Sequence, residues 1–155
     1  MLGNVFDNKP SYLITVLVVW CGNFVGTALT AFLIRQTRLS DALVSSARAV
    51  AEKKLNDSFL SLFILGIFCG ILMFVAVDTF KKNAEKKDTL IVYGVVMGVM
   101  VFIVAGFEHS IADMFYFVLA GKTVECLLPL LFITLGNFVG GNLIPLIKKL
   151  TACLE

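Results

Sequence analysis

Three ionisable side chains lie close together in a part of the sequence that is otherwise built for lipid. The stretch GFEHSIADMF, residues 106–115, contains Glu108, His109 and Asp113. An ionised group at the centre of a bilayer costs ~2.5–3.5 kcal/mol on insertion scales. Histidine titrates near neutral pH and responds readily to its surroundings. These residues therefore indicate proton exchange or ion contact beside a pore, rather than contact with lipid.

A metal site is the other chemistry that this spacing allows. His109 and Asp113 are four residues apart and would share one face of a helix. His109 is, however, the only histidine of the chain, and a catalytic zinc ion needs three protein ligands. The four cysteines form no CxxC or Cys/His pattern. We therefore expect no catalytic residues, no metal and no cofactor, and a protein that is not an enzyme.

The composition is that of an integral membrane protein. Of the 155 residues, 59% are hydrophobic and 15% are charged, and the mean hydropathy is +0.93. Soluble domains are about 45–50% apolar and about 25% charged. The length fits a single membrane domain over residues 1–155. A net charge of +2 is too small to indicate a nucleic-acid partner, and the first ten residues do not read as a signal peptide.

The apolar stretches predict an all-α protein with four membrane spans. A spanning helix needs about 20 mostly apolar residues. An amphipathic helix at the membrane interface is expected over residues 39–55, and a charged turn over residues 78–88. Lys and Arg are spread almost evenly over the two sides, so charge does not orient the chain. The expected spans are residues 12–34, 58–77, 90–120 and 126–147.

The third of these spans is too long to be one straight helix. At 1.5 Å per residue, residues 90–120 would extend about 46 Å, against a hydrocarbon thickness of about 30 Å. Tilt absorbs part of the excess, and a break near residues 106–110 absorbs it more naturally. Gly106 loosens the backbone there, and Glu108, His109 and Ser110 can bond the freed peptide groups. Irregular backbone at this depth must be buried in protein or line a wet cavity.

A short repeat links the first and last spans. The sequence GNFVG occurs at residues 22–26 and again at 136–140. Three crossings separate the copies, so the two helices run in opposite directions, as in transporters built from inverted repeats. Asn23 and Asn137 would then hold neighbouring backbone. Alternatively, the glycine pairs 22/26, 66/70, 94/98 and 136/140 are helix-packing faces. Both interpretations stay open.

Several of these motifs resemble one family. GFEHSIADMF is similar to the signature of the fifth, broken helix of the formate/nitrite transporter family. Residues 135–145 (LGNFVGGNLIP) resemble the sixth helix of that family, residues 20–29 (WCGNFVGTAL) the third, and residues 54–70 the fourth and its approach. The resemblance implies an inverted-repeat, aquaporin-like channel fold that assembles as a pentamer, with one pore per protomer.

The resemblance also implies a missing front. Family members have six spans, and the four expected here match the third to the sixth. Residues 1–4 resemble the end of the second helix, which in the family carries another break and a threonine facing the pore. Two residues depart from the pattern, because Asp113 and Gly70 stand where the family has asparagines. Asp113 adds a possible charge, and Gly70 removes a polar group.

The resemblance assigns roles to particular residues. His109 would meet a small monovalent anion at an apolar constriction and share or donate a proton. Phe102, seven residues earlier on nearly the same face, would be an apolar gate, and Lys54 would draw anions in. The alternatives are a structural histidine, a phenylalanine in the core or in lipid contact, and an interfacial lysine. Structural support of the site is expected from Glu108, Ser110, Asp113, Asn23 and Asn137.

The expected function is permeation of a small weak-acid anion, passive or proton-coupled. Formate, nitrite, hydrosulfide, lactate and acetate all fit this description. The protein would lie in the lipid bilayer of a prokaryotic cytoplasmic membrane, as a homo-oligomer. The alternative is a structural membrane protein without transport of its own: a gene fragment, an inactive remnant or a subunit completed by another chain.

Overall fold

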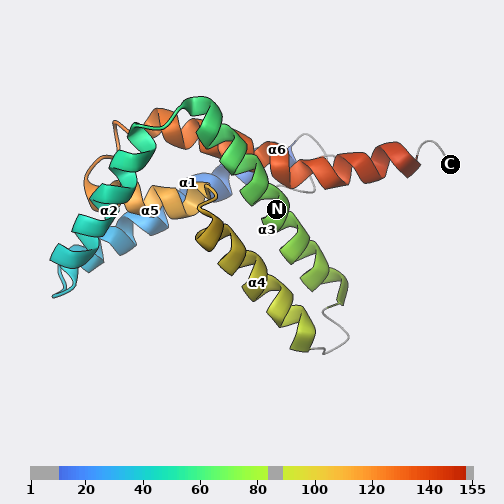
Figure 1. Cartoon of the computed structure of the whole chain (residues 1–155), viewed down its shortest axis with the longest axis horizontal. Helices are drawn as coiled ribbons and strands as arrows, with labels where there is room; N and C mark the ends of the chain where they lie inside the picture. Colours follow the sequence, from blue (N-terminus) through green and yellow to red (C-terminus); the bar gives the residue numbers. More distant parts are fainter. Residues whose placement is uncertain (1–10, 84–88, 153–155) are drawn as a thin grey trace.

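The computed structural model describes residues 11–83 and 89–152, and all regular secondary structure within these ranges is helical (Figure 1). Three helices, α1, α3 and α6, are long and apolar enough to cross a membrane, and α4 and α5 are bent by 52° at a short break. Residues 1–4 and the 84–88 part of the expected charged turn lie outside the described residues. The helices are α1 (Tyr12–Arg35), α2 (Ser40–Leu55), α3 (Phe59–Asn83), α4 (Thr89–Ala105), α5 (Ser110–Ala120) and α6 (Leu127–Ala152).

Two helices extend beyond the apolar stretches that predict them. The sequence predicts a turn from Asp78, but α3 continues to Asn83, so this part of the prediction is wrong. Likewise, α6 continues past the lysine pair 148–149 to Ala152. Charged residues end a hydrophobic span, whereas a helix ends where its backbone is broken or capped. Neither glycine nor proline occurs between Asp78 and Asn83 to break it.

The close contact between α3 and α6 depends on glycines of both helices. Gly66 and Gly70 of α3 face Gly136 and Gly140 of α6. A Cβ atom at Gly70 would lie 2.5 Å from the carbonyl oxygen of Asn137 and 2.8 Å from the amide nitrogen of Gly141. These backbones touch because small residues remove the side chains between them. Figure 1 shows the two helices crossing at this point.

The two copies of the GNFVG repeat have different surroundings. Gly136 and Gly140 of the second copy are packed against α3, whereas a Cβ atom at Gly22 or Gly26 would meet no atom of the described residues within 4 Å. The glycine-pair interpretation therefore describes α3 and α6, and the corresponding face of α1 is open. Gly94 of α4 is open as well.

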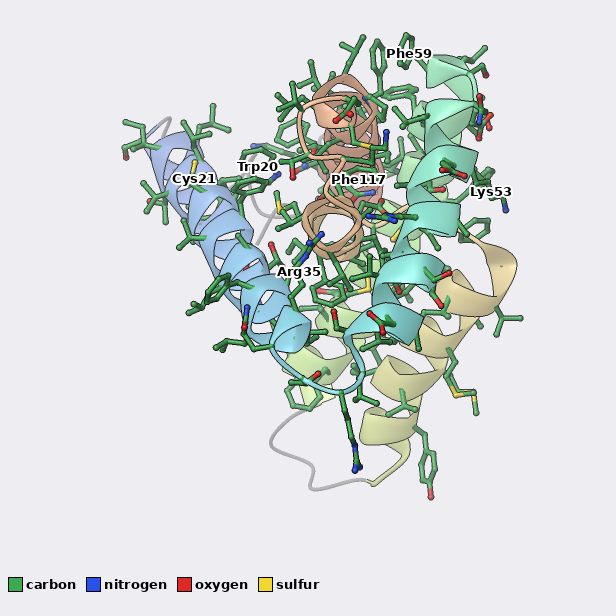
Figure 2. The ribbon with its side chains drawn as sticks, turned by 90° about the vertical axis from the view of Figure 1, so that its left-hand side faces the viewer. Trp20, Cys21, Arg35, Lys53, Phe59 and Phe117 are labelled. Carbon is green, nitrogen blue, oxygen red and sulfur yellow. The ribbon has the colours of Figure 1, made fainter. Side chains whose placement is uncertain are left out.

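The second packed region surrounds α5, which lies between α1 and α2. Its core joins Ala31 of α1, Ala47 and Ala51 of α2, and Met114 and Phe117 of α5, all at most 2% exposed. Figure 2 shows Phe117 near the centre of the molecule, with Trp20 of α1 directed towards the interior.

A hydrogen bond from α1 and a left-handed glycine fix the C-terminal end of α5. The guanidinium Nη2 of Arg35 donates a 2.5 Å hydrogen bond to the carbonyl oxygen of Leu119. Gly121 then leaves the helix with a φ of 72°, a conformation that glycine adopts at little cost. The short helix is thereby tied to α1 at one end and to the break at the other.

Candidate functional site

The break between α4 and α5 begins as a regular helix terminus. The amide of Gly106 donates to the Ile103 carbonyl at 3.2 Å, and the amide of Phe107 donates to the Phe102 carbonyl at 2.9 Å. Gly106 has a φ of 71°. This is the Schellman motif, in which a left-handed glycine closes the last turn. Residues 107–109 are not helical, and α5 starts at Ser110.

The backbone groups freed by the break are bonded by Asn137 of α6. Its Oδ1 accepts from the Ser110 amide at 2.9 Å, and its Nδ2 donates to the carbonyls of Glu108 at 2.7 Å and Gly66 at 2.9 Å. Buried peptide groups need such partners, most of all in a membrane. Asn137 therefore connects the break to α3 as well as to α6. The side chain of Asn23, its counterpart in the repeat, lines the cavity described below and forms no hydrogen bond with the described parts of the chain.

His109 is the N-cap residue of α5. Its Nδ1 accepts a 3.4 Å hydrogen bond from the Ala112 amide, so in the neutral ring the hydrogen is on Nε2. The Phe102 ring stacks on the imidazole, with centroids 5.5 Å apart and an interplanar angle of 27°. The two rings come from opposite sides of the break and meet across it.

An apolar cavity lies in front of the histidine. Its volume is about 670 Å³, and residues of α1, α3 and α6 form most of its wall. Four of the residues expected at the site line it, whereas Phe102, Lys54, Glu108 and Asp113 are not part of the wall. The four are His109, Ser110, Asn23 and Asn137.

Lys54, Glu108 and Asp113 meet elsewhere, in a buried cluster. The Lys54 ammonium forms an ion pair with Glu108 Oε2 and lies 2.9 Å from Asp113 Oδ1. The three residues are 9%, 7% and 2% exposed, so Lys54 does not extend into water as an interfacial lysine would. Burial lowers the pKa of Lys54, but the two carboxyl groups raise it by more, and the net shift is upward. Lys54 is therefore a cation at neutral pH.

The sequence alone did not point to two further residues at the site. Trp20 lines the cavity, and its indole Nε1 is buried without a hydrogen-bond partner among the described residues. Cys69 is fully buried and also lines the cavity. The signal for Trp20 was present, because it is the only tryptophan and lies in the middle of a span. Nothing in the sequence marks Cys69.

These features define a helical membrane protein with a broken helix beside an apolar cavity. The family model for formate/nitrite transporters matches residues 7–148. The chain therefore belongs to the formate/nitrite transporter family.

Individual relatives are moderately similar. The chain is 33% identical over 103 residues to the formate channel FocA of Haemophilus influenzae, an alignment that covers 64% of this chain and 36% of that channel. It is 29% identical over 113 residues to the formate channel FocB of Escherichia coli, covering 68% and 38%. It is also 29% identical over 154 residues to the formate-nitrite transporter of Plasmodium vivax, covering 86% and 47%. The chain thus spans half or less of each of these relatives. No solved structure gives a significant match.

Proposed function

We propose that the chain acts as a channel or transporter for small monovalent weak-acid anions such as formate or nitrite. The observation that carries this proposal is the position of His109, which caps α5 at the break and lines an apolar cavity. The names of the relatives, formate channels and formate-nitrite transporters, support the same substrate class.

The geometry favours the imidazole as a hydrogen-bond donor to the anion. An anion that enters an apolar cavity loses its water shell and needs a donor in return. Nδ1 of His109 accepts from Ala112, so the neutral ring offers the N–H of Nε2. Doubly protonating the ring would require Nδ1 to release that cap. The ring therefore shares its proton with the anion, and a complete transfer needs a proton from elsewhere.

Phe102 supports the apolar gate. Its ring stacks on the imidazole and covers one face of it, which limits the access of water to that face. A histidine shielded in this way forms a stronger hydrogen bond with an anion than one in bulk water. Lys54 would act indirectly in this arrangement, through Glu108, because its ammonium is bound to carboxyl groups.

The larger assembly is also part of the proposal. With the bent pair α4–α5 as one span, the chain has four candidate spans, and an inverted repeat would give α1 and α6 equivalent, oppositely directed positions. In α6, the Gly136/Gly140 face packs against a neighbouring helix. In an inverted-repeat, aquaporin-like fold, the open Gly22/Gly26 face of α1 would pack against another helix in the same way. By the same resemblance, the chain would assemble as a homopentamer in a prokaryotic cytoplasmic membrane.

Anion flux into proteoliposomes tests the function, with formate and nitrite as substrates over a range of pH. We expect His109→Asn to abolish the flux or remove its pH dependence, because asparagine can still cap α5 but does not titrate. Phe102→Leu should alter the flux, whereas Phe32→Leu, at an exposed position on α1, should not. Unchanged transport by His109→Asn would exclude the imidazole from the mechanism.

A second candidate is a subunit that transports nothing on its own. Two observations favour it: the open glycine face of α1, and the fraction of each relative that the chain covers. The DNA upstream should be read for two apolar spans with a broken helix. Flux that appears only when such a segment is co-expressed would support this candidate, and flux by the 155-residue chain alone would refute it.

A further inference from the structure

A buried group of charged side chains lies behind the break and is not used by the proposed anion path. It consists of Lys54 of α2, Glu108 of the break and Asp113 of α5, and we refer to it as the carboxyl–lysine cluster. None of the three residues lines the cavity, and none is more than 9% exposed. Because so little water reaches the cluster, its charges have to be balanced by protein groups or by protons.

The protein groups alone do not balance these charges. One ammonium faces two carboxyl groups, and Lys54 is the cation that interacts with Asp113 in the described ranges. The carboxyl groups of Asp113 and Glu108 are neighbours on the same ammonium, where a hydrogen bond between them would relieve their repulsion. Two ionised carboxylates are both acceptors, so they can form such a bond only when one carries a proton.

A second observation concerns the other oxygen of Asp113. Its Oδ2 is buried and has no hydrogen-bond partner in the described part of the chain, although the residue is only 2% exposed. A bare carboxylate oxygen in such a place is costly. One proton on the carboxyl pair removes the excess charge, and a proton on Oδ2 would leave no bare carboxylate oxygen there.

We propose that Glu108 and Asp113 share one proton above the Lys54 ammonium, which makes the cluster a proton-binding site inside the broken helix. Loading the site forms one O–H bond on the carboxyl pair, and release breaks that bond. From α1, Arg35 bonds the far end of α5, and α6 contributes the uncharged Asn137. The other titratable groups near the cluster are Cys69 of α3, Cys126 before α6, and His109 at the break.

The consequence for transport rests on the proposed function. The capping His109 ring has one proton and shares it, so an anion that leaves as the neutral acid needs a proton from another group. The carboxyl–lysine cluster holds such a proton within the same broken helix. Transport would then carry a proton with each anion, and the carboxyl pair would be a positioning and proton-holding element beside the histidine.

Infrared spectroscopy of the purified protein, in a detergent that contains no carbonyl group, tests the proton site directly. A protonated carboxyl group absorbs at a C=O frequency that carboxylates lack, so the wild type should show this absorption at neutral pH. Asp113→Asn and Glu108→Gln should each lose it, since either variant leaves one carboxylate for one ammonium. Asp41→Asn, the same change at an exposed position of α2, should retain it.

Absence of the absorption in the wild type at neutral pH would overturn the proposal, and so would its persistence in both cluster variants. The wild-type measurement is decisive even if a variant fails to fold. Measuring proton uptake and anion uptake together distinguishes failure of the proton site from failure of the proposed function. Absorption without any anion flux leaves the proton site standing and removes the proposed function. Flux without the absorption leaves the proposed function standing and removes the proton site.

Discussion

Lys54 and Lys53 are neighbours in the chain with opposite surroundings. Lys53 points away from the bundle in Figure 2 and is exposed, whereas Lys54 is buried against Glu108 and Asp113. A buried cation next to two carboxyl groups contributes mainly by preventing their charges from being left alone. The stability lost when Lys54 is removed is therefore larger than the net stability that the ion pair contributes.

Replacing Lys54 should destabilise the fold strongly. We expect Lys54→Met to lower the free energy of unfolding by ~3–5 kcal/mol, because two buried carboxyl groups lose their cation. Lys53→Met should change it little. Denaturant unfolding in detergent, followed by circular dichroism, measures both variants. Similar losses for the two would show that the cluster is not a buried charge site.

At the scale of elements, one glycine sets the direction of the chain at the break. Gly106 adopts a φ of 71°, and a Cβ atom there would meet no atom of the described ranges within 4 Å. Its role is therefore conformational rather than steric. Gly22 of α1 is equally uncrowded but lies within a regular helix. Comparing substitutions at the two glycines therefore distinguishes an effect of backbone conformation from an effect of packing.

Alanine substitutions at these two positions should have opposite effects. Gly106→Ala should cost ~1–2 kcal/mol of stability, the penalty of the left-handed conformation for a residue with a side chain. Gly22→Ala should stabilise the helix by ~0.5–1 kcal/mol, because glycine is a poor helix former. Thermal unfolding in detergent checks the sign. A stabilised Gly106→Ala would mean that the break does not have this geometry.

The contact between α3 and α6 gives a second prediction at this scale. Gly140→Ala places a Cβ atom against the Ile67 carbonyl of α3, so we expect a loss of ~1–3 kcal/mol from overpacking. Gly26→Ala, the same repeat position in α1, has open space and should be tolerated by the 155-residue chain. Equal damage from both in unfolding experiments would contradict the asymmetry between the two copies.

The break could be predicted from the sequence because its causes are local. The stretch was too long for one span, and Gly106 preceded polar residues that can bond free peptide groups. The charged turn from Asp78 was wrong for the part within α3, since polarity marks the end of a span and not of a helix. The cluster of Lys54 with Glu108 could not be predicted, because 54 residues separate the two and only tertiary packing brings them together.

On the scale of the whole molecule, the open face of α1 should be detectable by chemistry. Cys21 is exposed beside Gly22, whereas Cys69 and Cys126 are buried. In a Cys153→Ser background, we expect a maleimide to label Cys21 of the detergent-solubilised chain and to spare the other two. Co-expression with a segment that docks on α1 should slow the labelling. Unchanged labelling in a complex that purifies together would place the docked segment elsewhere.

The shortness of α5 has a consequence for biosynthesis. Its 11 residues extend only about 16 Å at 1.5 Å per residue, roughly half the hydrocarbon thickness. During translation, α5 therefore cannot enter the bilayer as an independent unit. It has to follow α4 and find α1 and α2 already in place, because residues of both join Phe117 in the buried core and Lys54 of α2 pairs with Asp113. Because α1 and α2 are synthesised first, the surface on which α5 packs is present before α5 leaves the ribosome.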